Sequence, residues 1–259
     1  MKGDLSQVVK NRKKIFEVIE KLGNEIVQCK AKCKGIENNQ RDGYYPRIFF
    51  LDPENASEIE VLVVGENPGN SAFLEREFYK VLSERNRAKV AMFKDCRRVW
   101  RTIVKEHDYY LRPKHLLKQL GLNPKGTLFA EVVFCEKSHS TGRIPNKTFE
   151  KCCNRFLRKI VKLVPEKKYI LCLGTNAFVY TRNMPESAHK KLIAAYHPTG
   201  SRIFANYFEK EKGKKIIGRR LKRKILTDFR ALEASNKPYM CKIRSKAVTS
   251  LYPSKQKEN

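Results

Sequence analysis

The sequence contains no apolar run that approaches the roughly 20 residues of a membrane-spanning helix. Its first residues, MKGDLSQVVKNRKK, also lack the apolar region of a secretory signal peptide. Both absences argue against a membrane protein and against an exported one. We therefore expect a cytoplasmic protein that has no membrane partner.

Acidic residues are scarce, since 27 Asp and Glu stand against 55 Lys and Arg, giving a formal net charge of +28 and a pI near 9.9. A chain this basic attracts polyanions through the release of their counterions. Because nothing in the sequence indicates membrane insertion, nucleic acid is favoured over a membrane surface as the polyanion. We expect binding to weaken steeply as salt is raised.

A disulfide framework is not expected either, because the eight cysteines occur in a chain of cytoplasmic character. Cys172 lies in the apolar stretch YILCLG and is interpreted as core packing. Cys29 and Cys33, in CKAKC, are the only short-spaced pair apart from the adjacent Cys152 and Cys153. One pair is weak evidence for a metal, whereas four thiolates gathered by the fold would suit zinc or an iron–sulfur cluster.

What the sequence does contain is an alternation of strand-like and helix-like segments. Apolar runs predict strands over residues 61–65, 128–134, 168–173 and 192–196, and amphipathic patterns predict helices over residues 8–28, 72–105, 145–164 and 213–233. Such alternation is typical of a parallel sheet with helices on both faces. We predict an α/β fold, a three-layer α/β/α sandwich with a central four-stranded, mainly parallel sheet.

A single domain is expected to span residues 1–234, with the N-terminal helix and the cysteine pair preceding a core over residues 58–234. Residues 235–259 are polar, basic and weakly patterned, so we predict a mobile C-terminal tail.

The stretch VLVVGENPG carries the clearest functional signal. A buried strand breaks at Gly65 into a turn that places Glu66 and Asn67 at the carboxyl end of the strand. Ligands of open α/β sheets bind at that end. A purely structural turn, in which Asn67 only caps the loop, would use similar residues and stays as the alternative.

Five motifs in order give the chain a resemblance to a known family. They are the cysteine pair after the first helix, the GENPG turn, a strand ending at Cys135, the segment CNRFLRKIVKLVPEKKYILCLG, and AAYHPTGSR. In this order the chain resembles the uracil-DNA glycosylase superfamily, and its iron–sulfur branch most closely, from about Glu20 to Leu232. The GENPG turn is also similar to those of the mismatch-specific and single-strand-selective branches.

The resemblance implies a catalytic set for hydrolysis of an N-glycosidic bond. Glu66 would be the assisting carboxylate, Asn67 would position water, and His197 would donate a hydrogen bond to O2 of the leaving base. The flipped base and its DNA would be contacted by residues that include Gly65, Pro68, Gly69, Phe73, Glu131 and Arg202. Phe73 would stack on the base. Arg202, with Ile203, would fill the gap left by the base, or else contact a phosphate.

Glu131 departs from the family pattern, because uracil-excising members carry an Asn at the aligned position. A carboxylate can accept from the exocyclic amine of cytosine, and a protonated carboxyl can donate to cytosine N3. Glu131 therefore favours a cytosine-derived base. The alternatives are that it pairs with a Lys or Arg beside the pocket, or that the register is off by one residue.

The resemblance also implies a structural [4Fe–4S] cluster held by Cys29, Cys33, Cys135 and Cys153, with zinc as the alternative occupant. The neighbouring Cys152 stays open as the fourth ligand in place of Cys153. Two departures are the three residues between Cys29 and Cys33, where two are usual, and the longer stretch before Cys153.

From these observations we expect a monofunctional DNA glycosylase of bacterial, archaeal or viral origin that acts as a monomer on uracil or a modified cytosine and leaves an abasic site, which an endonuclease could process. One alternative is an anti-phage defence glycosylase specific for hypermodified cytosine, such as glucosylated hydroxymethylcytosine. The other is a non-catalytic DNA-binding member.

Overall fold

The structure, a computed structural model, describes residues 5–47, 50–52, 59–71, 73–85, 92–99, 108–138, 143–195, 197–198, 208–211, 214–217 and 240–242. Its centre is a sheet of six strands in the order β10-β7-β6-β3-β4-β2. The four middle strands are β3 (Val61–Gly65), β4 (Thr127–Glu131), β6 (Tyr169–Leu173) and β7 (Lys191–Ala195), and they run parallel. The predicted four-stranded parallel core is therefore confirmed.

Two short strands extend this core at its edges. β2 (Phe50–Asp52) pairs antiparallel with β4, and β10 (Met240–Lys242) pairs parallel with β7. Every residue of β3, β4 and β6 is buried, which explains why their sequences are nearly unbroken apolar runs rather than alternating ones.

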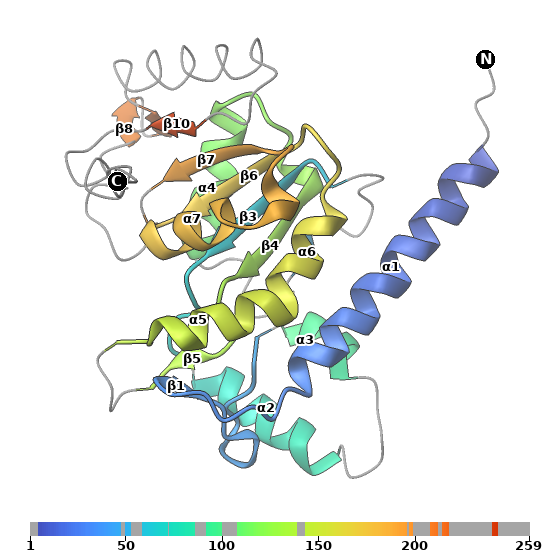
Figure 1. Ribbon diagram of the computed structural model, residues 1–259, viewed down its shortest axis with the longest axis vertical. Coiled ribbons are helices and arrows are strands. Elements are labelled where there is room, and N and C mark those ends of the chain that lie inside the picture. The colour runs from blue at the N-terminus through green and yellow to red at the C-terminus, as the bar shows by residue number, and fades with distance from the viewer. Residues whose placement is uncertain are drawn as a thin grey trace, which may run out of the picture.

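Helices cover both faces of the sheet, so the three-layer α/β/α arrangement is confirmed (Figure 1). α7 (Thr175–Arg182) and α6 (Arg158–Leu163) lie in front of the strands in this view, and α4 (Asp108–Gln119) lies behind them. α5 (Asn146–Cys152) continues through a π-helical turn, η5 (Cys153–Leu157), into α6, which confirms the helix predicted to begin near Pro145. The short 3-10 helices are η1 (Gln40–Asp42), η4 (Pro124–Gly126) and η6 (Pro185–Ser187).

The remaining helices gather at one end of the molecule. α1 (Leu5–Val27) packs on α3 (Met92–Val99) where Gly23 meets Phe93, and a Cβ on Gly23 would lie 2.0 Å from that ring. α2 (Phe73–Arg85) packs on α3. The predicted helix over 72–105 is thus two helices within the described residues.

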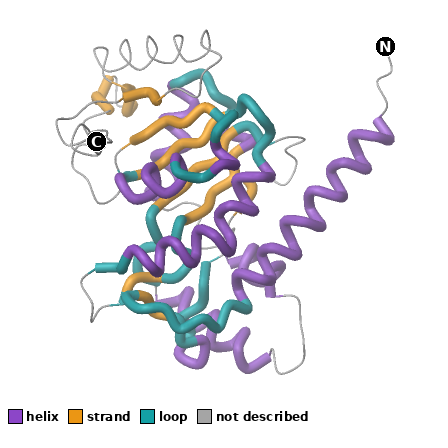
Figure 2. Tube along the Cα trace, viewed as in Figure 1, coloured by secondary structure: helices purple, strands orange, loops and turns teal. Residues whose placement is uncertain are grey.

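Figure 2 shows that the chain between α1 and the sheet is mostly loop. A small antiparallel pair is embedded in it, formed by β1 (Ile36–Glu37) and β5 (Glu136–Lys137). None of the described helices is long and apolar enough to cross a membrane.

One prediction for the C-terminal part needs correction. The helix predicted over 213–233 is wrong at its start, because β8 (Phe208–Glu211) and β9 (Lys214–Ile217) form an antiparallel hairpin that pairs Phe208 with Ile217. Aromatic and β-branched residues favour such strands, and the hairpin outweighs the helical spacing of the charges. Within the predicted tail 235–259, β10 lies in the sheet; the rest of both segments lies outside the described residues.

Candidate functional site at the carboxyl ends of the strands

Four strand ends bring the predicted polar residues to one edge of the sheet. Gly65 ends β3 and is paired with Glu131, which ends β4. Gly174 follows β6, its N–H donates to the carbonyl of Ala195 over 2.8 Å, and its φ of 93° suits glycine. A Cβ on Gly174 would lie 3.9 Å from the Cβ of His197. Because the strands are parallel, this edge is the ligand-binding end that open α/β sheets use.

The GENPG turn is held to the residues that follow β4. The N–H of Val132 donates to the carbonyl of Gly65 over 2.9 Å, and that of Val133 donates to the carbonyl of Glu66 over 3.0 Å. These bonds extend the β3–β4 pairing beyond the strands. Glu66 therefore stands on a backbone that is fixed to the sheet.

Asn67 hydrogen-bonds within its own turn, since its side-chain amide donates to the carbonyl of Pro68 over 2.8 Å. Glu66 and Asn67 are half-buried, Pro68 is buried and Gly69 is exposed. The capping contact is what a structural turn would show. The structure thus brings Glu66 and Asn67 to the predicted edge of the sheet.

Glu131 is a buried carboxyl, with 7% of its surface exposed. The hydroxyl of Tyr109 donates to Oε1 over 2.8 Å, whereas Oε2 has no hydrogen-bond partner within the part of the chain that the structure describes. Burial raises the pKa of Glu131 to about 8; Tyr109 and the charge of Arg47 oppose this rise, and Glu66 adds to it. Glu131 is therefore mainly neutral at pH 7.

Arg47, the neighbouring arginine, does not form an ion pair with Glu131, as one alternative for Glu131 would require. Arg47 forms its ion pair with Glu75, between Nε and Oε1 over 2.9 Å, and donates from Nη2 to Ser71 over 3.1 Å. Ser71 in turn donates from its hydroxyl and its N–H to Glu136, each over 2.7 Å. This buried network anchors the chain between the GENPG turn and α2.

Tyr109 is the site residue that sequence reasoning missed. Its ring lies 5.4 Å from that of His197 between centroids, so one side chain contacts both His197 and Glu131. One turn further along α4, Arg112 donates to the carbonyl of Pro198 over 2.5 Å. No motif marks Tyr109 in the sequence; the available signal was Gly65, whose Cβ would lie 1.7 Å from the Tyr109 hydroxyl and 2.1 Å from Oε2 of Glu131.

His197 is half-buried, and burial lowers its pKa. The imidazole is therefore neutral at pH 7 and offers one N–H donor and one acceptor. This is the form suited to hydrogen-bonding a neutral base that acquires negative charge as it leaves.

The remaining predicted contacts divide into two groups. Phe73, the first residue of α2, is 67% exposed and lies just beyond the turn that carries Glu66, so its ring is available to a partner. Arg202 and Ile203 lie outside the described residues.

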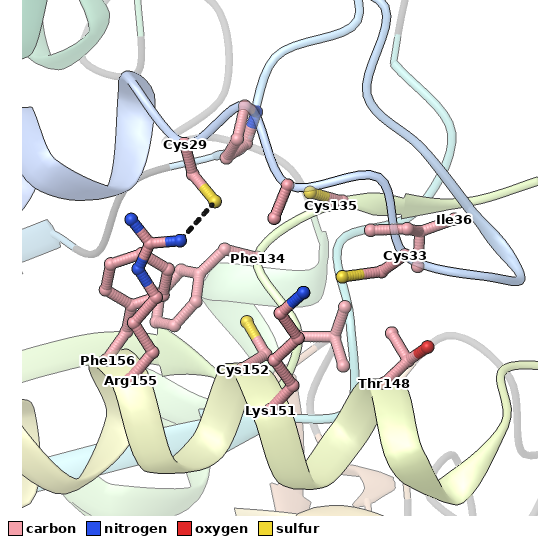
Figure 3. A pocket seen from close by; sticks show the side chains of 13 residues that line it. Cys29, Cys33, Ile36, Phe134, Cys135, Thr148, Lys151, Cys152, Arg155 and Phe156 are labelled. Atoms are coloured by element: carbon pink, nitrogen blue, oxygen red, sulfur yellow. Dashed lines mark hydrogen bonds between the residues drawn. The ribbon is translucent and has the colours of Figure 1, made fainter.

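A cluster of cysteines lies near Cys135, four residues after Glu131. Cys29 and Cys33 from the loop after α1, Cys135 after β4, and Cys152 at the end of α5 line one pocket (Figure 3). Neither Glu131 nor His197 lines this pocket. The fold thus gathers four cysteines from three distant segments.

The cysteine of the helix that lines the pocket is Cys152 and not Cys153, which favours Cys152 as the fourth ligand. Thr148, Cys152 and Phe156 follow one another at intervals of four residues and therefore share the helix face that lines the pocket. Cys153 lies one residue round the helix, is buried, and has Arg158 and Glu186 as its charged neighbours.

The pocket brings together thiols, the donor type that soft metal ions prefer. Burial raises the pKa of Cys152 to about 12 and that of Cys135 above its ordinary value, and the neighbouring cysteines add to both shifts. Thiolates gathered here would need a cation beside them. Arg155 donates from Nη1 to Sγ of Cys29 over 3.5 Å. Within the described ranges, no three His, Cys, Asp or Glu side chains converge on one metal-ion position.

Two further cysteines, Cys172 and Cys96, are packing residues. Cys172 in β6 is fully buried, as predicted, and Cys96 in α3 is buried in the core.

Comparison with known proteins gives one family. The model described as the uracil DNA glycosylase superfamily matches residues 53–217, more than half of the 259-residue chain. The matched range includes the GENPG turn, Glu131, Cys135, Cys152 and His197. No curated protein matches the chain.

Proposed function

Because the chain belongs to the uracil-DNA glycosylase superfamily, whose members are DNA glycosylases, we propose that it is a monofunctional DNA glycosylase that removes a cytosine-derived base from DNA. The observation that carries this proposal is the buried, mainly neutral carboxyl of Glu131 at the sheet edge shared with His197. The GENPG turn at the same edge supports it.

The hydrogen-bonding capacity of Glu131 decides which bases suit the site. A neutral carboxyl whose Oε1 accepts from Tyr109 has one O–H left to donate, from Oε2. Cytosine N3 is an acceptor for that proton, and ionised Oε2 would accept from the exocyclic amine. Uracil O4 can also accept from the neutral form, so uracil stays as the second candidate.

The reaction needs four further side chains. Water positioned by Asn67 attacks C1′ of the flipped nucleotide, and its proton passes to Glu66 as the bond between C1′ and the base nitrogen breaks. The electron pair of that bond leaves with the base. Neutral His197 donates to O2 and stabilises the negative charge that develops there, and Phe73, exposed beside the turn, stacks on the base.

DNA affinity comes from the net charge of +28 rather than from base contacts. We expect the observed association constant to fall by at least about tenfold between low and moderate salt. Binding that hardly changed over that range would contradict this part of the proposal.

We further propose that Cys29, Cys33, Cys135 and Cys152 hold a structural [4Fe–4S] cluster. Four thiols from three segments on one pocket, with burial that disfavours uncompensated thiolates, support it. When bound, the cluster would supply cross-linking of the loop after α1 to the sheet and α5. Zinc is the alternative, and iron, sulfide and zinc contents of the purified protein distinguish the two.

The testing experiment is an abasic-site assay with matched duplex and single-stranded DNA that contains uracil, cytosine, hydroxymethylcytosine or glucosylated hydroxymethylcytosine. We expect product from a modified cytosine, and product confined to hypermodified cytosine would favour a role in defence against phage. Product from uracil alone would make the protein a repair glycosylase and overturn the proposal that it removes a cytosine-derived base. DNA binding without any product would favour the non-catalytic alternative.

A further inference from the structure

Tyr109 has contacts that a packing residue does not need. Its side chain is buried in α4, yet its hydroxyl is aimed at Oε1 of Glu131 over 2.8 Å. Its ring is packed edge-on against Tyr110, with centroids 5.1 Å apart, and lies 5.4 Å from the ring of His197. Two groups that approach different edges of a bound base in the proposed function are therefore held by one side chain.

The direction of the hydrogen bond follows from the state of the phenol. Burial raises the pKa of Tyr109 well above its ordinary value, and the neighbouring Glu131 adds to the rise. The hydroxyl keeps its proton and donates it to Oε1. A neutral carboxyl that accepts at Oε1 carries its own proton on Oε2, which is the oxygen without a partner within the described residues.

Gly65 supports the same arrangement from the neighbouring strand. Oε2 of Glu131 and the hydroxyl of Tyr109 both occupy the space where a side chain at position 65 would begin, with 2.1 and 1.7 Å to its Cβ. The missing side chain gives the pair its room. Gly65, the first glycine of the GENPG turn, thus leaves room for both the carboxyl and the phenol.

We propose that Tyr109 is a specificity-determining positioning residue. Its hydroxyl hydrogen-bonds Oε1 of Glu131, so Oε2 is the atom of Glu131 that contacts the base. The inference rests on the proposed function, since it concerns how that site reads its substrate. It makes α4 part of the recognition machinery. The expected substrate is a pyrimidine that presents an acceptor at the Watson–Crick edge, with cytosine N3 as the best-suited atom.

Other groups face Glu131 and share in its pH response. Arg47 lowers its pKa through its positive charge and Glu66 raises it, while Tyr109 lowers it through the hydrogen bond. Removing only the Tyr109 hydroxyl leaves Arg47 and Glu66 in place. A change in that variant therefore reports on the hydrogen bond rather than on the surrounding charges.

The test is Tyr109→Phe, which keeps the ring beside His197 and removes the donor. We expect the rate ratio between the preferred base and the next best base to fall by about threefold to tenfold, the worth of one hydrogen bond. The hydrogen bond lowers the pKa of Glu131 in the unchanged protein, so its removal should raise that pKa. The fall in rate at alkaline pH should therefore move to higher pH. A filler of the core would alter neither the ratio nor the pH profile.

Tyr110→Phe is the matched control, because Tyr110 is buried in the same helix and packs its ring on Phe129 at 5.2 Å. We expect its base preference and pH profile to equal those of the unchanged protein. An active Tyr109→Phe variant with unaltered ratio and profile would overturn the inference.

A second measurement keeps the inference separate from the proposed function. The carboxyl of Glu131 is titrated by NMR in the full chain, with and without Tyr109→Phe. A raised pKa in the variant supports the contact even if no base is removed, in which case the glycosylase proposal alone fails. An unchanged pKa overturns the role of Tyr109 whatever the activity.

Discussion

Glu131 and Cys135 are four residues apart, yet they belong to two sites that are organised in different ways. Glu131 ends a buried strand and has its carboxyl fixed by the hydroxyl of Tyr109 from α4. Cys135 lies beyond the strand and faces Cys29, Cys33 and Cys152, which come from a loop and a helix end. The first site is organised by side chains that contact one another, while the thiols of the second have contacts such as the Arg155 guanidinium at Cys29 and the backbone of Phe134 at Cys152.

The difference indicates where each site draws its rigidity. The polar edge is preorganised, since β3 and β4 continue their pairing through Val132 and Val133 into the GENPG turn. The cysteine pocket joins segments far apart in the sequence and depends on the proposed cluster for the same effect. Variants at the two sites should therefore fail in different ways: loss of chemistry at one, and loss of metal and stability at the other.

The largest expected effect is at the cysteine pocket. Cys152→Ser removes a thiol that lines it, so we expect most of the bound iron to be lost and the melting temperature to fall by roughly 5–10 °C. Cys153→Ser changes its neighbour in sequence, which lies off the pocket, and should keep its iron. Iron per chain and thermal melts measure both, and the opposite order would restore Cys153 as the ligand.

At the polar edge, His197→Ala should lower the rate of abasic-site formation by about 10²–10³-fold, because one donor to the developing charge is removed. Iron content and melting temperature should stay within error, which separates this site from the cysteine pocket. His189→Ala, at an exposed position, is the control and should leave the rate unchanged. Equal rates for both variants would remove His197 from the mechanism.

Gly65→Ala tests how tightly the polar edge is packed. The new Cβ would collide with the Tyr109 hydroxyl and with Glu131, so we expect the free energy of unfolding to fall by about 1–3 kcal/mol. Gly69→Ala, in the same turn, meets nothing within 4 Å and should change it by less than about 0.5 kcal/mol. Urea denaturation of the two variants gives the comparison, and equal values would show that the turn yields easily.

The most gradual effect appears as a slope of stability with pH. The folded protein holds the proton of Glu131 up to a pKa of about 8, against 4.5 for the ordinary side chain, so folding stability falls as pH rises between these values. Glu131→Gln removes this dependence, and its stability relative to the unchanged protein should rise by at most about 1.4 kcal/mol per pH unit. Denaturation at pH 5, 6.5 and 8 measures it, with the exposed Glu150→Gln as a control that should follow the unchanged protein.

The sheet and the polar edge were predictable because buried strands have continuous apolar sequences that can be recognised. VLVVG matches β3 at both ends, and the turn after it had to lie at the carboxyl edge. Glu131 was aligned, through its distance from Cys135, with the base-reading Asn of the resembled family. Its strand was predicted to run to residue 134, whereas β4 ends at Glu131. The buried state of Glu131 was not foreseeable, since burial depends on α4, which packs there from elsewhere in the chain.

Tyr109 was missed, and the choice between Cys152 and Cys153 was left open, for two separate physical reasons. Tyr109 acts across a tertiary contact with a residue 22 positions away, and a tyrosine in a charged segment carries no pattern that reveals such a contact. For adjacent cysteines, the choice depends on helical phase, because one residue turns the side chain by about 100°. Only the position of the helix against the pocket fixes that phase.

The π-helical turn Cys153–Leu157 means that this helix carries one residue more than a regular helix of the same length would need. Deletion of one residue at that turn would leave a regular α-helix. Cys152, before the turn, would still line the pocket, and Ile160 and Val161, after it, would stay in the core. A related sequence with a plain α-helix here would be one residue out of step with this chain. Aligning the two correctly requires a gap inside the helix, where gaps are usually forbidden.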